Sequence, residues 1–84
     1  MLNEYLQAAI KSANYKVFEE DSTIYGEIPD CRGVFANART YEECRNELLE
    51  VLEGWIFLRM RKNLFIPIIE NIDLNIPETA DAAY

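Results

Sequence analysis

Apolar residues follow a helical spacing in two stretches of the chain, residues 2–13 and about residues 41–62. In both stretches they recur every three or four positions, which places them on one face of a helix. In the longer stretch these positions are Tyr41, Cys44, Leu48, Val51, Leu52, Trp55 and Leu58. We therefore expect two amphipathic helices, with the longer one as the element around which the fold is organised.

Residues at the helix ends carry the corresponding start and stop signals. Thr40 followed by Glu43 predicts a capping box, in which each side chain bonds an amide at the start of the long helix. Acidic residues follow this start, and the basic residues Arg59, Arg61 and Lys62 precede the end, so both ends suit the helix dipole. Asn14 is expected to end the short helix, because Asn tolerates the left-handed conformation found there.

Short segments rich in β-branched and aromatic residues lie between and after the helices. The predicted strands cover residues 15–20, 23–28 and 34–38, and the two-residue gap at positions 21–22 has the length of a hairpin turn. Residues 65–69 are also apolar and β-branched, but Pro67 restricts them to an edge strand. Consecutive strands with short turns pair antiparallel, and a helix must cover one face of such a sheet.

These elements predict an α+β fold in two layers. It consists of a three-stranded antiparallel sheet plus an edge strand, packed by one long helix, with an extra N-terminal helix. Because the chain has only 84 residues, we expect a single domain over residues 1–84, with a core at 14–70 and a loose tail at 78–84. A core this small is thin, and association into a dimer or tetramer would add to it.

The alternation in the second predicted strand separates its two faces but does not say which one is buried. Ile24, Gly26 and Ile28 fall on one face, and Tyr25 and Glu27 fall on the other. If the Ile face lies inside, Tyr25 is free to anchor a partner, as exposed aromatic residues often do. In the alternative arrangement, Tyr25 packs under the N-terminal helix.

The acidic charge of the chain narrows the class of partner. A formal net charge of −7 argues against nucleic acid and anionic membranes, because neutralising phosphates requires a basic surface. It suits a basic protein partner, or solubility alone. Met1 leads into a polar amphipathic segment rather than a signal peptide, and no apolar run approaches membrane-spanning length. We expect a cytoplasmic protein.

The composition argues against catalysis and against a bound cofactor or metal. The chain has no histidine, which removes the commonest general base and most metal sites. Cys31 and Cys44 show no metal-binding spacing; a nucleophilic thiolate at Cys31 would have only Arg32 beside it, and Cys44 lies on the apolar helix face. We therefore predict a protein that is not an enzyme and binds no cofactor.

The outer side of the long helix offers two candidate interaction surfaces. One is a row of carboxylates, which is a solvated face or a docking surface for a basic partner. The other is apolar, because the long helix is hydrophobic over more than half of its circumference and needs a second contact, from the N-terminal helix or from another subunit. The residues expected at an oligomer contact are Phe57, Met60 and Ile68.

An ordered set of motifs over about residues 15–70 resembles the HicB antitoxin family. The motifs are Tyr25-Gly26-Glu27-Ile28-Pro29-Asp30, then Arg32-Gly33-Val34-Phe35-Ala36-Asn37-Ala38, then Thr40-Tyr41-Glu42-Glu43-Cys44, and a late Ile66-Pro67. Cys44 replaces the usual Ala, and Arg39 replaces an acidic residue before Thr40. The helix at residues 2–13 is an addition to the minimal pattern.

The resemblance implies a partial ribonuclease-H-like fold without nuclease activity. It also implies the neutralisation of a small basic HicA-like toxin, which cleaves mRNA. Many HicB proteins carry a C-terminal DNA-binding domain; this chain ends at Tyr84 without room for one, so we expect no direct binding of nucleic acid. The alternative to an antitoxin is a homo-oligomeric scaffold with no toxin partner.

The candidate partner-binding residues lie on the predicted strands and their turns. Asp30 and Arg32 lie on the predicted turn, where they are recognition residues or only turn formers. The full candidate set is Tyr25, Glu27, Asp30, Arg32, Glu19 and Glu20.

Overall fold

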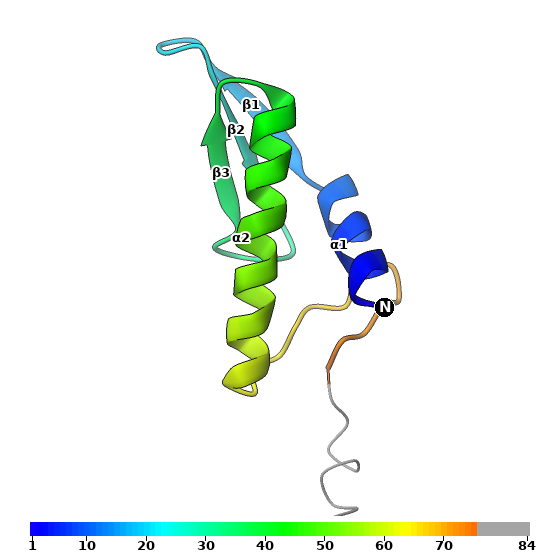
Figure 1. The fold of residues 1–84 in the computed structure, drawn as a ribbon. Coiled ribbons are helices and arrows are strands. Elements are labelled where there is room, and N and C mark those ends of the chain that lie inside the picture. The colour runs from blue at the N-terminus through cyan, green and yellow to red at the C-terminus, as the bar shows by residue number, and fades with distance from the viewer. Residues whose placement is uncertain (76–84) are drawn as a thin grey trace, which may run out of the picture.

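The computed structural model describes residues 1–75, and Figure 1 shows their arrangement. The elements in chain order are α1 (Leu2–Lys11), β1 (Asn14–Phe18), β2 (Thr23–Glu27), β3 (Phe35–Ala38) and α2 (Tyr41–Arg61). Two helices and a three-stranded antiparallel sheet confirm the predicted α+β fold. The expected tail at 78–84 lies outside the described residues.

The sheet has the strand order β1-β2-β3, and small residues line the face that α2 covers. Ile24, Gly26, Ala36 and Ala38 are buried on this inner face. A Cβ atom added at Gly26 would lie 2.9 Å from the Sγ atom of Cys44 and 2.9 Å from the Cδ1 atom of Leu48. The absence of a side chain at Gly26 therefore allows α2 to approach the sheet closely.

Helix α2 begins at the predicted cap, but its buried stripe is narrower than expected. The Thr40 hydroxyl accepts a hydrogen bond from the Glu43 backbone N–H at 3.1 Å. The buried side chains follow a four-residue step: Cys44, Leu48, Leu52 and Ile56. Of the expected core positions, Tyr41, Val51 and Leu58 are exposed and Trp55 is half-buried, so that part of the prediction is wrong. A row with this step runs obliquely along a helix and leaves its flanks uncovered.

Helix α1 ends earlier than predicted, and Asn14 does not terminate it. The backbone N–H of Ser12 donates to the Ala9 carbonyl at 3.1 Å, and the Ser12 hydroxyl donates to the same carbonyl at 2.7 Å. These bonds satisfy the Ala9 carbonyl at the end of the helix, so no residue in the left-handed conformation is needed there. Asn14 is instead the first residue of β1.

Residues 65–69 do not form the predicted edge strand. Within residues 1–75, this segment takes part only in an isolated bridge between Ile69 and Ile72. Its backbone forms hydrogen bonds with side chains instead of with a neighbouring strand. The Asn75 amide accepts from the Ile66 N–H at 2.8 Å and donates to the Ile66 carbonyl at 2.8 Å. Pro67 has no N–H to offer a ladder, which favours this irregular path.

The irregular segment closes the core between the two helices. The Tyr5 hydroxyl of α1 donates to the Pro67 carbonyl at 2.6 Å, and the Arg59 Nε atom of α2 donates to the Phe65 carbonyl at 2.7 Å. Within this segment, the side chains of Ile66 and Ile69 are buried in the core. In Figure 1 this yellow-to-orange segment runs from the end of α2 across to α1.

Candidate protein-binding face

The outer face of the sheet, opposite α2, carries large aromatic side chains, whereas small residues lie at the centre of the inner face. In the register, Tyr25 pairs with Lys16 on one side and with Asn37 on the other, so these three residues share the outer face. Phe18 and Phe35 fall on it by the same alternation. Among the described elements, α2 lies along the inner face and α1 lies beside α2, which leaves the outer face uncovered (Figure 1).

Three aromatic rings, one from each strand, form a continuous strip across the outer face. The ring centroids of Phe18 and Tyr25 are 5.7 Å apart with an interplanar angle of 19°, and those of Tyr25 and Phe35 are 6.2 Å apart at 28°. The contacts are diagonal across the strand pairs, which long aromatic side chains can span. Phe35 is 56% exposed and Phe18 is 39% exposed. We refer to Phe18, Tyr25 and Phe35 as the aromatic strip.

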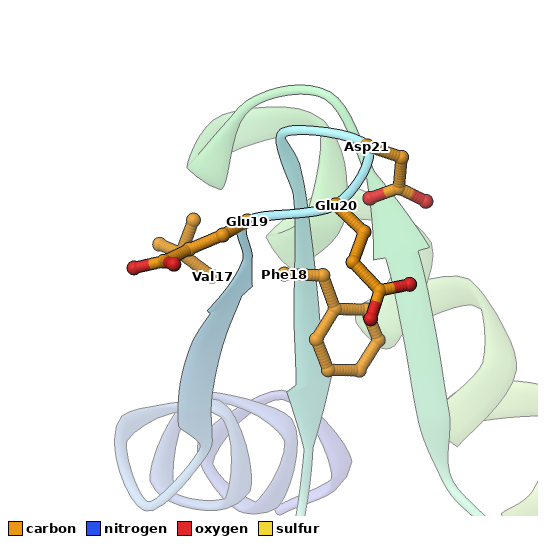
Figure 2. Close-up of a pocket in the computed structure, with 5 residues that line it drawn as sticks. All are labelled: Val17, Phe18, Glu19, Glu20 and Asp21. Carbon is orange, nitrogen blue, oxygen red and sulfur yellow. The ribbon is translucent and has the colours of Figure 1, made fainter.

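Carboxylates gather at the hairpin tip beside one end of the aromatic strip. The tip holds a shallow hollow of about 440 Å³. In Figure 2 the Glu20 side chain lies on the same side of the tip as Phe18. Glu19 extends with Val17 toward the other side of the tip. The hollow is lined by Val17, Phe18, Glu19, Glu20 and Asp21. A cation resting on the Phe18 ring would thus have a carboxylate beside it.

Hydrogen bonds connect the hairpin tip to the far strand. The Asp21 carboxylate accepts from the Thr23 hydroxyl at 2.6 Å and from the Thr23 backbone N–H at 3.1 Å. These bonds hold the pKa of Asp21 below its ordinary value. The Asn37 amide of β3 in turn donates to the Thr23 hydroxyl oxygen at 2.9 Å. The tip is therefore fixed relative to the sheet rather than held by the turn alone.

A second hollow of about 420 Å³ lies along the free edge of β1. It is lined by Asn14, Tyr15, Lys16, Phe18, Tyr25 and Glu27. Lys16 and Glu27 give this hollow one charge of each sign, whereas the hairpin tip is purely acidic. The aromatic strip therefore separates an acidic end from a mixed one.

The structure brings together some of the predicted partner-binding residues and separates others. Tyr25 lies in the strip with Glu27 on the same strand and face, and Glu19 and Glu20 lie at the tip. Asp30 and Arg32 are exposed on the β2–β3 loop, which Figure 1 places at the opposite end of the sheet from the tip. In that loop the N–H of Cys31 bonds the Ile28 carbonyl, and Gly33 has a φ of +96°.

Sequence reasoning missed Phe18, Phe35 and Lys16 as members of this face. Their alternation was visible strand by strand, but only the cross-strand register places Phe18 and Phe35 on either side of Tyr25. The oligomer candidates Phe57, Met60 and Ile68 are all exposed and lie away from the strip, on α2 and the segment after it.

Neither cysteine belongs to the candidate site. Cys31 and Cys44 are both fully buried, and burial raises the pKa of each thiol. The Cys31 Sγ atom lies 3.9 Å from the Tyr5 hydroxyl in the core. Both thiols therefore stay protonated at neutral pH, which is the opposite of what a nucleophilic cysteine needs.

Solved structures and protein families contain clear relatives of this chain. The crystal structure of TTHA0281 from Thermus thermophilus superposes with a TM-score of 0.81 at 31% sequence identity, covering 92% of this chain and 95% of that one. No curated protein matches the chain. No helix among residues 1–75 is long and apolar enough to cross a membrane. The family model described as UPF0150-like matches residues 4–67, which includes the whole sheet, α2 and all but the first two residues of α1. The chain therefore belongs to the UPF0150-like family, a family of small antitoxin-like proteins.

Proposed function

We propose that this protein is a non-catalytic, HicB-like antitoxin that binds and neutralises a small basic toxin of the HicA type, which cleaves mRNA. The observation that carries the proposal is the aromatic strip, which lies on a sheet face that none of the described elements covers. Membership of the UPF0150-like family supports an antitoxin-like role. The net charge of −7 supports a basic partner.

The outer face suits a protein partner rich in arginine. Guanidinium groups stack on aromatic rings, and they pair with carboxylates in a planar, two-point geometry. The aromatic strip offers the rings, and Glu20 offers a carboxylate beside Phe18 at the tip. Such a toxin uses basic residues to hold RNA, so occupation of those residues by this face would block its activity.

The test is co-expression with the small basic protein of the adjacent reading frame, followed by affinity capture and light scattering. We expect capture of that protein and relief of its toxicity. Phe35→Ala should weaken the complex by about 2 kcal/mol, roughly 30-fold, as truncation of an interface anchor does.

Phe65→Ala is the matched control, because it removes an equally exposed phenylalanine from the segment after α2. Phe35 is 56% exposed and Phe65 is 62% exposed. If both substitutions weaken the complex equally, the aromatic strip is not the binding face. If no small basic protein is captured at micromolar concentrations, the antitoxin function itself is wrong.

A further inference from the structure

Gly54 lies near the middle of α2, where no contact inside the monomer requires a glycine. A Cβ atom added there would meet no other atom within 4 Å. Glycine in a helix interior costs about 1 kcal/mol relative to alanine. The close packing that explains Gly26 therefore does not explain Gly54. An exposed helical glycine suits a site where a second backbone approaches closely.

The residues around Gly54 form one exposed face of α2. Positions three, four and seven residues away in either direction share this face. They are Glu47, Glu50, Val51, Phe57, Leu58 and Arg61, and all six are exposed. Gly54 stands two residues from both Leu52 and Ile56, which are buried, so this face points away from the core side of α2.

The outermost charges of this face, Glu47 and Arg61, are ordered so that each meets its opposite in an antiparallel copy. Acidic residues precede Gly54, and Arg61 follows it. Glu47 and Arg61 stand seven residues before and after Gly54, at matching distances from it. The salt bridge found within residues 1–75 joins the N-terminal amine to Glu4, so neither Glu47 nor Arg61 has a charged partner within the described chain.

The apolar side chains lie between these charges. Val51 stands three residues before Gly54, and Phe57 and Leu58 stand three and four residues after it. Their exposed fractions are 39%, 59% and 51%. In two antiparallel helices related by a two-fold axis at Gly54, Val51 of each copy would face Phe57 of the other. Three apolar side chains from each copy would then be buried away from water.

The geometry points to a second copy of this chain as the occupant of this face, in an antiparallel α2–α2 pair centred on Gly54. Glu47 of each copy pairs with Arg61 of the other, and the absent side chain at Gly54 allows the helices to meet. Phe57 belongs to this contact, as the sequence suggested. Met60, which lies on another side of α2, and Ile68, which lies beyond the helix, do not. This contact is separate from the aromatic strip and does not depend on the proposed toxin binding.

The charge-swap experiment tests both the contact and its register. The dissociation constant of the full chain is measured by sedimentation equilibrium for wild type, Glu47→Arg, Arg61→Glu and the double variant. We expect a dimer in which each single substitution raises the dissociation constant tenfold or more, because it places like charges opposite each other. The double variant restores the opposite signs and should return to within a few-fold of wild type.

Several outcomes would overturn the inference. They are a wild-type chain that stays monomeric up to about millimolar concentration, single substitutions without effect, and a double variant that remains as weak as the single ones. Circular dichroism checks that each variant folds, which we expect because both side chains are exposed. Gly54→Leu provides an independent reading, since it should retain the helix and raise the dissociation constant tenfold or more. An unchanged dimer in that variant would also overturn the inference.

Discussion

The two faces of the sheet differ in side-chain size as well as in polarity. The inner face carries Gly26, Ala36 and Ala38 beneath α2, whereas the outer face carries Phe18, Tyr25 and Phe35. Large aromatic residues usually favour a core, yet here the small residues are inside. Close packing of a helix on a sheet explains the inner face, and binding explains the outer one. The difference teaches that small residues, together with apolar character, identify the face on which a helix packs closely.

The largest effect is expected from a methyl group added to the inner face. Gly26→Ala should lower the free energy of unfolding by about 1–3 kcal/mol, because its Cβ would lie 2.9 Å from Cys44 Sγ and from Leu48 Cδ1. Urea denaturation followed by circular dichroism measures this change.

Gly54→Ala is the control for that substitution, at a protein concentration where the chain is monomeric. It should raise the stability by up to about 1 kcal/mol, because alanine favours the helix and its Cβ meets no atom within 4 Å. Equal effects at the two glycines would contradict the close packing of the inner face.

A smaller loss in the free energy of unfolding is expected when the buried Tyr5 hydroxyl is removed. Tyr5→Phe should cost about 1 kcal/mol at neutral pH, because the Pro67 carbonyl loses its donor. Burial is the main cause that raises the pKa of Tyr5, and Cys31 adds to it. The folded chain therefore keeps this proton at a pH where the unfolded chain releases it. This contribution is complete below about pH 10 and is lost as the pH rises further.

The pH dependence of urea denaturation checks this expectation. Above about pH 10, wild type should lose stability more steeply than Tyr5→Phe, which lacks this titrating group. Burial raises the pKa of Cys31 in both proteins, but Tyr5→Phe removes the Tyr5 hydroxyl that lowers it, so this thiol offsets part of the difference. Identical slopes for the two proteins would mean that the Tyr5 hydroxyl is not held in a dry core.

The smallest effect on stability is expected from the outer face. Phe35→Ala should change the free energy of unfolding by about 1 kcal/mol or less, because an exposed ring loses mainly its stacking on Tyr25. Urea denaturation of the isolated chain measures it. A loss as large as that of Gly26→Ala would show that the aromatic strip supports the fold and is not reserved for a partner.

Local sequence signals were sufficient to predict α2 and the strands of the sheet, but not which face of a strand is buried. The capping residue Thr40 and the helical spacing of the apolar residues predicted α2 within one residue of its observed end. The alternation of Ile24 and Tyr25 left the buried face open, because each side of β2 carries a large side chain that a core can accept. The size of Gly26 was the clue that decides it, since only a covered face requires so small a residue.

The errors arose where distant residues decide the structure. The chain at residues 65–69 has the composition of a strand, but Asn75, Tyr5 and Arg59 bond its backbone from elsewhere in the sequence. Local composition cannot reveal such bonds. The aromatic strip was missed for the same reason, because its three rings meet only through the register of three strands. Tyr25 alone was identified from its own strand.

The bond between Tyr5 and Pro67 also bears on the order in which the chain folds. The two residues are 62 positions apart, and the Tyr5 side chain is fully buried. During synthesis, α1 therefore leaves the ribosome long before the segment that covers it exists. The hairpin and α2 can form from contacts between near neighbours, whereas α1 must wait for a large loop to close. The first element to be made is thus expected to be among the last to take its final place.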